Sequence, residues 1–158
     1  MSLRKTTLAT FASIMLTLGV LASSQSILAA GDCLRVKGSE SAVNNGDGTL
    51  SGTLTHAGRL NGTTHVVVTS AFTPTPDPNT FSFTDDFTLT TRKGDLVTHN
   101  VTLLDLTNGL VTAIGQIDPN ASTGDFAGAS GVLYINGTTA DGGATVQTKI
   151  TGDVCLAN

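Results

Sequence analysis

Apolar and polar residues alternate along most of the chain after residue 31, and no segment there repeats apolar residues at helical spacing. The clearest alternation runs from residue 81 to 91, where serine, threonine and Asp86 occupy one face. The opposite face carries Asp85 together with Phe81, Phe83, Phe87 and Leu89. Successive side chains of a β-strand point to opposite faces, so a period of two predicts strands. The pattern predicts an all-β protein.

Clusters of glycine, asparagine, aspartate and proline divide this region, and such residues favour turns because of their backbone conformations. They separate eight expected strands: 33–38, 49–57, 59–72, 81–91, 95–106, 110–117, 132–138 and 144–155. No repeat or linker interrupts them. An even number of short antiparallel strands predicts one eight-stranded β-barrel domain over residues 31–158.

The longest predicted hairpin sets which side chains face the interior of this barrel. Arg92-Lys93-Gly94 fits a three-residue loop with glycine in the left-handed position. In that register Thr91 pairs with Asp95, Phe87 opposes His99, and the apolar faces of the two strands coincide. The expected lining of a ligand cavity is therefore Phe81, Phe83, Phe87, Val101 and Leu103.

The same register makes Asp85 and His99 diagonal neighbours on inward faces, and they are the candidate catalytic residues. A carboxylate that orients an imidazole can form a general base. The alternatives are a hydrogen-bonded polar pair in the barrel interior, or an error of register that puts one of the two in water. His56 is expected on the inward face of its strand and His65 on the outward face. These side chains lack the short ligand spacing of a zinc site.

The first thirty residues have the features of a cleaved signal peptide. Arg4 and Lys5 precede an apolar run over 8–21 that is short for a membrane span, and small residues follow. Cleavage between Ala30 and Gly31 would leave 158 − 30 = 128 residues. A lipoprotein is the alternative, although Cys33 comes late for a lipid-bearing cysteine. We expect a periplasmic or secreted protein with no membrane span in the mature chain.

Charge and cysteine content agree with export. Residues 31–158 contain six basic and twelve acidic side chains, a formal charge of 6 − 12 = −6, and the scattered cations exclude nucleic-acid binding. Cys33 and Cys155 lie on the outward faces of the first and last strands. In an exported protein they are expected to form a disulfide that links the ends of the barrel. Two free thiols or a metal site are the alternatives, and a third ligand is lacking nearby.

No motif of established chemistry occurs in the sequence. G-x-S-x-G, a P-loop, a dinucleotide fingerprint and HExxH are all absent, so no cofactor is expected. Residues 44–48 alternate oxygen-bearing side chains with glycine, as calcium loops do. The twelve-residue spacing and the final glutamate of such a loop are missing, which favours a plain turn.

The segment Thr123-Gly-Asp-Phe-Ala-Gly-Ala-Ser-Gly131, followed by an apolar strand, resembles the G-T-G-x-F-x-G-A-x-G signature of the allene oxide cyclase and dirigent superfamily. Similar segments occur in exported bacterial proteins without assigned roles. Ser122 departs from the glycine of the pattern. The resemblance implies an eight-stranded, calycin-like barrel whose cavity holds apolar or phenolic ligands in plant relatives. The catalytic residues of those relatives do not align with this chain.

Two functions follow as expectations. The first is an exported, non-enzymatic barrel that binds a small apolar or phenolic molecule or serves as a structural or partner module. The second is a cofactor-independent isomerase or cyclase that uses Asp85 and His99. The ligand, the oligomeric state and the choice between a filled and a hollow interior stay open at this point.

Overall fold

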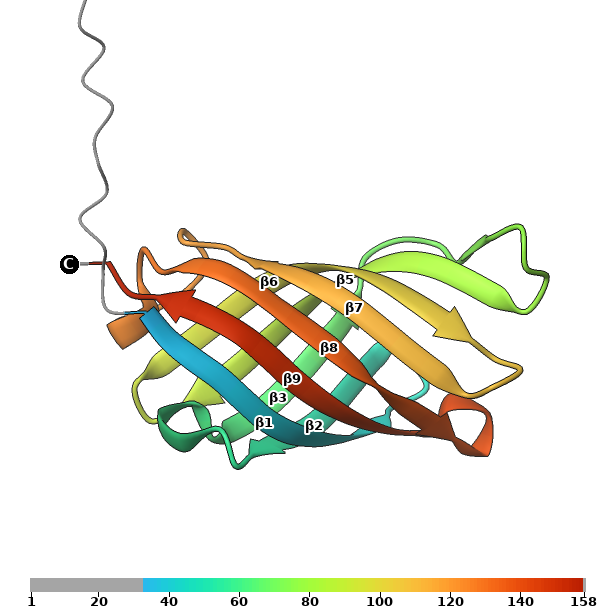
Figure 1. The fold of residues 1–158 in the computed structure, drawn as a ribbon, viewed down its shortest axis with the longest axis horizontal. Helices are drawn as coiled ribbons and strands as arrows, with labels where there is room; N and C mark the ends of the chain where they lie inside the picture. The colour runs from blue at the N-terminus through green and yellow to red at the C-terminus, as the bar shows by residue number, and fades with distance from the viewer. Residues whose placement is uncertain (1–32, 158) are drawn as a thin grey trace, which may run out of the picture.

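Eight long strands follow one another around a closed antiparallel barrel in the computed structural model, which describes residues 33–157 (Figure 1). Their bounds are β1 Cys33–Asn44, β2 Thr49–Thr55, β3 Gly62–Val68, β5 Thr80–Thr91, β6 Gly94–Asp105, β7 Leu110–Ile117, β8 Ser130–Ala140 and β9 Thr145–Cys155. Each pairs with its neighbours in sequence, and β9 pairs with β1. The predicted fold is confirmed, whereas the expected signal peptide lies outside the described residues.

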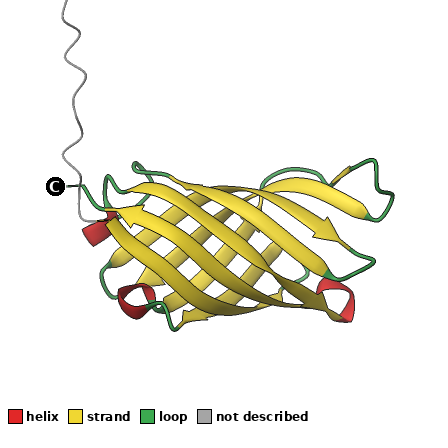
Figure 2. Cartoon of the chain, viewed as in Figure 1, coloured by secondary structure: helices red, strands yellow, loops and turns green. Residues whose placement is uncertain are grey.

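Short elements complete the described chain (Figure 2). The two-residue strand β4, Thr73–Pro74, pairs with β5 just beyond the stretch of β5 that pairs with β3. Three 3-10 turns lie at the ends of the barrel: η1 Gly58–Leu60, η2 Gly124–Phe126 and η3 Asp141–Gly143. The described residues contain no helix of sufficient length and apolar character to cross a bilayer.

The first strand is longer than expected. The sequence analysis ended it at Gly38 and assigned residues 39–48 to a polar connection, but β1 continues to Asn44 and pairs with both β2 and β9. Glu40 and Ala42 are buried on its inward face. The prediction was wrong because a polar segment was taken for a loop, whereas the Glu40 carboxylate is buried inside the barrel with a hydrogen bond from Thr148.

The second strand is shorter than expected. It ends at Thr55, and the next residue, His56, has a φ of 59°. Gly58 is also left-handed, so the chain reverses through η1 before β3 begins at Gly62. This reversal leaves His56 exposed, and its predicted inward orientation is wrong. His65 is exposed, as expected.

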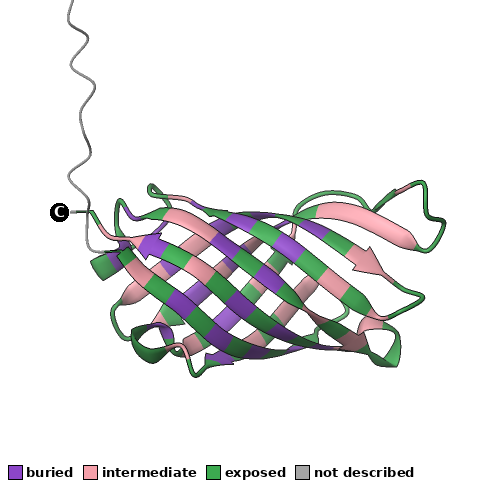
Figure 3. Cartoon of the chain, in the orientation of Figure 1, coloured by how far each residue is buried: buried purple, intermediate pink, exposed green. Residues whose placement is uncertain are grey.

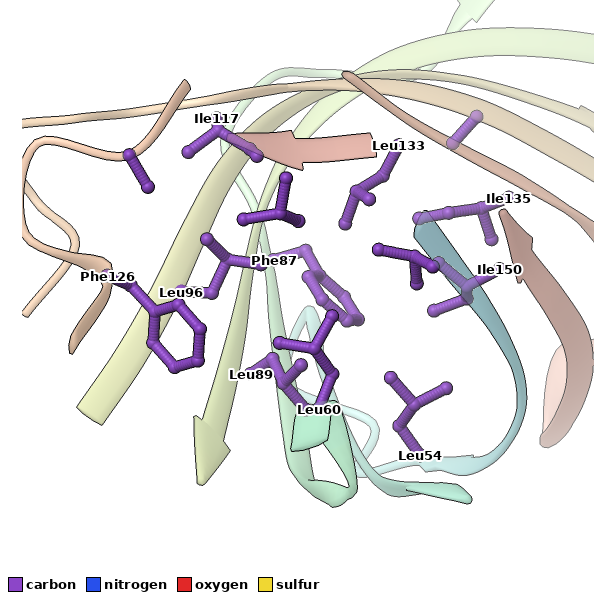
Figure 4. Packing of buried hydrophobic residues seen from close by; sticks show 14 residues of the cluster. Leu54, Leu60, Phe87, Leu89, Leu96, Ile117, Phe126, Leu133, Ile135 and Ile150 are labelled. Atoms are coloured by element: carbon purple, nitrogen blue, oxygen red, sulfur yellow. The ribbon is translucent and has the colours of Figure 1, made fainter. Parts of the chain in front are cut away.

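Apolar side chains fill the end of the barrel where β1 begins and β9 ends, which we call the closed end. Buried positions alternate with exposed ones along the strands (Figure 3). Figure 4 shows how side chains from different strands meet there. The cluster includes Leu54, Leu60, Phe87, Leu89, Leu96, Ile117, Phe126, Leu133, Ile150 and Val154. Burial of apolar surface away from water is the main favourable term in folding.

The glycine-rich segment before β8 seals this end. Phe126 is 3% exposed and packs in the apolar cluster from η2 (Figure 4). Gly124 has a φ of 59°, and a Cβ there would collide with the carbonyl oxygen of Lys93. Gly131 has a φ of 139°, and a Cβ there would likewise collide with the carbonyl oxygen of Asp153 on β9. The glycines thus allow close backbone approach, while Phe126 fills the barrel.

The disulfide lies at the same end. Cys33 and Cys155 are directly paired residues of β1 and β9, and their sulfur atoms are bonded. The predicted cross-link between the first and last strands is confirmed.

Candidate functional site

The opposite end of the barrel, which we call the open end, contains a cavity of about 540 Å³. Four connections surround it: the β1–β2 turn, the segment from β3 to β5, the β6–β7 turn and η3. Ligand pockets for small molecules commonly have volumes of about 300–1,000 Å³. The cavity therefore has the size of a small-molecule site, and it lies within one barrel rather than between domains.

The walls near the mouth are apolar and come from most of the strands. They include Leu50, Val66, Val68, Phe72, Phe81, Phe83, Leu104, Leu106, Val111 and Val146. Phe72, in the segment between β3 and β4, stacks at a tilt on Phe83, with ring centroids 4.5 Å apart. Such walls favour an apolar molecule because burying its surface removes that surface from water.

A polar network lies deeper in the barrel, around Asp85 of β5. Asn100 Nδ2 donates to Asp85 Oδ1 at 2.7 Å, and Thr102 Oγ1 donates to Oδ2 at 2.5 Å. Thr98 Oγ1 in turn donates to Asn100 Oδ1 at 2.7 Å. Burial raises the pKa of Asp85, and the hydrogen bonds from Thr102 and Asn100 oppose that rise. Both carboxyl oxygens are thus held by the protein.

Glu40 is the second carboxyl group in the cavity lining, on β1 and only 5% exposed. Thr148 Oγ1 donates to its Oε2 at 2.8 Å. Oε1 is also buried, and no donor among the described residues reaches it. An unpaired buried acceptor is costly, so this oxygen distinguishes Glu40 from the fully bonded Asp85.

The predicted pairing of Asp85 with His99 is wrong. Thr91 pairs with Gly94, so the hairpin loop contains only Arg92 and Lys93, and Asp85 opposes Asn100. Gly94 takes a φ of 129°, and a Cβ there would collide with the backbone of Thr123. Glycine therefore belongs to the strand instead of the loop. A shift of one residue moves every following side chain to the other face.

The same shift places two predicted cavity residues on the outer surface. Val101 is 61% exposed and Leu103 is 45% exposed, while Thr102 and Leu104 face inward. Val101 is the cross-strand neighbour of Ile114, which is in turn the neighbour of Tyr134. The three form an exposed apolar row across β6, β7 and β8. Phe81, Phe83 and Phe87 do line the cavity.

His99 lies on the outside, in a different network. Its Nδ1 is 2.6 Å from Asp86 Oδ1, and its Nε2 is 3.0 Å from Asp118 Oδ2. The hydrogen bond to Asp86, and to a smaller extent the one to Asp118, raises the pKa of His99. The imidazole thereby joins β5 and β6 to the loop after β7. It lies on the outer face of β6 and does not line the cavity, so it does not face a molecule held inside.

Sequence reasoning missed Glu40, Asn100, Thr102 and Thr148, all of which are inward and polar. The alternation Val36, Gly38, Glu40, Ala42 was a usable signal for Glu40, because it continues the inward face of β1. For β6 the signal was the choice between a two-residue and a three-residue loop. Among residues 33–157, no three His, Cys, Asp or Glu side chains are grouped so as to hold a metal ion.

No protein-family model, curated protein or solved structure matches this chain. The fold therefore rests on the structure itself, and the resemblance of residues 123–131 to allene oxide cyclases and dirigent proteins stays a prediction.

Proposed function

We propose that this barrel binds a small, mostly apolar molecule in the cavity at its open end. The observation that carries the proposal is the contrast inside one barrel between a filled closed end and a hollow open end lined by Phe72, Phe81 and Phe83. Protein interiors are close-packed, and the side chains around a cavity of this size lack van der Waals contacts unless another molecule fills it. A bound ligand would fill it.

Binding is better supported than isomerisation. The isomerase hypothesis relied on Asp85 and His99 acting together inside the cavity, and His99 is on the outer surface. Asp85 therefore has no histidine beside it in the cavity, and both its carboxyl oxygens already accept hydrogen bonds from Asn100 and Thr102. Membership of the allene oxide cyclase and dirigent superfamily is part of the proposal only as far as the shared barrel and its central cavity.

We also infer that the protein works outside the cytoplasm. The leader pattern of residues 1–30 and the disulfide between Cys33 and Cys155 support this. Disulfides persist in oxidising compartments such as the periplasm and the extracellular space.

A fluorescence titration with the neutral apolar probe N-phenylnaphthylamine tests the binding function. We expect saturable emission enhancement with the wild-type protein. Leu104→Trp, which adds volume to the cavity wall, should abolish the enhancement. Leu103→Trp is the matched control, because the same change at the next residue of β6 points outward and should leave binding intact.

An equal loss of probe binding in both variants, or enhancement that never saturates, would contradict the proposal. Circular dichroism of each variant establishes that the barrel is folded before the titrations are compared.

A further inference from the structure

We propose that the ligand is an organic cation, an apolar molecule bearing a protonated amine, and that Glu40 is the group that receives the amine. This inference rests on the proposed binding function and adds to it the chemical class of the ligand. It is carried by three observations: the unpaired oxygen of Glu40, the charge of the cavity lining, and the distribution of charges between the two ends of the barrel.

Glu40 lacks a hydrogen-bond donor at one carboxyl oxygen while lying in the cavity lining. The other oxygen is anchored by Thr148. Oε1 is itself buried, so an amine reaches it only when the carboxyl group turns. The terminal torsion of a glutamate is broad enough for that turn, which gives up the hydrogen bond from Thr148 and exchanges it for one from the ligand. A protonated amine offers three donors and a positive charge, and a charge-assisted hydrogen bond is about twice as strong as a neutral one.

The cavity lining carries acidic side chains and no basic one. Glu40 and Asp85 are the ionisable residues among those that line it, and lysine, arginine and histidine are absent from the lining. A ligand carboxylate would bring a like charge into a site of low dielectric, which is unfavourable, whereas a cation offsets the buried negative charge. The aromatic walls agree with this, because ring faces attract cations.

The surface charges point the same way. The open end carries Asp47 and Asp77 in loops, Asp105 at the end of β6 and Asp141 in η3. No lysine or arginine of the described residues lies in the connections at this end. Hydrogen bonds from Thr49 lower the pKa of Asp47, and hydrogen bonds from Asn108 lower the pKa of Asp105. Both carboxyl groups are therefore ionised at neutral pH. Most lysine and arginine side chains of the described residues lie toward the closed end: Arg35, Lys37, Arg59, Arg92 and Lys93. Lys149 lies in the middle of β9.

Near the closed end Asp95, Asp118, Asp125 and Asp153 balance most of the basic side chains, so the open end is the more negative of the two. This excess of negative charge attracts a cation during its approach and repels an anion. The steering acts on the same class of molecule that the unpaired Glu40 oxygen selects inside the cavity. Two independent features of the structure therefore favour one ligand charge.

The test compares three probes of matched shape, phenylbutylamine, phenylbutanol and phenylbutanoate, each displacing N-phenylnaphthylamine from the wild-type protein at neutral pH. We expect the amine to bind at least about tenfold more tightly than the carboxylate, as a charge-assisted contact implies, with the alcohol between them. Equal affinities, or tighter binding of the carboxylate, would overturn the inference.

Variants then locate the selecting group. Glu40→Gln keeps an acceptor for Thr148 and removes the charge, so it should weaken the amine by roughly tenfold and leave the alcohol nearly unchanged. Asp85→Asn is the matched comparison, and we expect a smaller effect because Asn100 and Thr102 already occupy its oxygens. If only Asp85→Asn removes the preference, Glu40 is not the receiving group and the assignment falls.

The two proposals fail in different ways. If the neutral probe binds and all three competitors displace it equally, the cavity is a binding site and only the cation inference is lost. If no probe binds, the proposed function itself is lost. Should Glu40→Gln fail to fold, the ranking of the three probes on the wild-type protein still decides the ligand class.

Discussion

The closed and open ends of this barrel are built from the same eight strands, yet their interiors are opposites. At the closed end, Leu96, Phe126 and Leu133 belong to a continuous apolar cluster. Toward the open end the inward positions become Glu40, Asp85 and the residues around them, and beyond these the walls enclose a cavity. One end accounts for the stability of the fold, and the other is available for binding.

The difference shows how a small barrel can stay stable although part of its interior is a cavity. A filled interior gains contact energy at every position, whereas polar groups in the middle of the barrel need partners in order to be tolerated. Asp85 has such partners in Asn100 and Thr102, and Glu40 has one in Thr148. This polar group lies beside the inner part of the cavity, where Phe87 of the apolar cluster also lines it. The disulfide adds a constraint at the closed end.

The largest expected effect comes from removing the disulfide. Cys33→Ser together with Cys155→Ser releases a loop closed across 122 residues. The chain-entropy account of such a loop predicts a loss of about 4–5 kcal/mol in the free energy of unfolding. Urea denaturation followed by circular dichroism measures it. A loss below about 1 kcal/mol would show that the cross-link contributes little to the closed end.

The next effect compares one substitution at both ends of a single strand. Leu96→Ala removes a fully buried side chain from the apolar cluster and should cost about 2–5 kcal/mol. Leu104→Ala, also on β6, removes a partly exposed side chain from the wall of an existing cavity and should cost less than Leu96→Ala. Urea denaturation of the two variants measures both. Equal losses would contradict the distinction between the ends.

A smaller effect is expected in the polar layer. Asp85→Ala leaves the donors of Asn100 and Thr102 without an acceptor and should cost roughly 1–3 kcal/mol. Asp85→Asn retains an acceptor and should cost less. Because burial raises the pKa of Asp85, the native state binds its proton more tightly, so this group's contribution to stability falls as the pH rises above 3.8.

The asparagine variant should lack that fall. Denaturation at several pH values compares it with the wild type, and identical pH profiles would show that Asp85 does not titrate differently on folding.

The smallest effect concerns His99 on the outer surface. Its raised pKa means that the stabilisation is complete below the unfolded value of 6.5 and is lost as the pH rises through the folded pKa. The side chain is 58% exposed, so screening by solvent limits the effect to less than about 1 kcal/mol. His99→Gln should flatten the stability profile between neutral and alkaline pH.

An unchanged profile in His99→Gln would mean that its contacts with Asp86 and Asp118 do not stabilise the fold.

Much of the architecture could be read from local pattern. The alternation over residues 81–91 predicted β5 and the inward position of Asp85 correctly. Clusters of turn-forming residues predicted the bounds of β7, which spans Leu110–Ile117 as expected. These predictions succeed because strand periodicity and glycine conformations depend on neighbours along the chain.

The candidate site could not be read in the same way. The sequence chose a three-residue loop at Arg92-Lys93-Gly94, whereas contact between Gly94 and Thr123, far apart in the chain, accompanies the two-residue loop. That single residue decides whether Val101 and His99 or Thr102 and Asn100 enter the barrel. Polar residues 39–44 likewise became part of β1 only through pairing with β2 and β9.

The sequence by itself therefore determined the all-β class, the number of long strands and the pairing of Cys33 with Cys155. Tertiary structure alone decided the register of β5 with β6, the burial of Glu40, and the hollow open end. The physical reason is that alternation specifies two faces for every strand, while the choice of the inner face and the space left inside depend on contacts between distant strands.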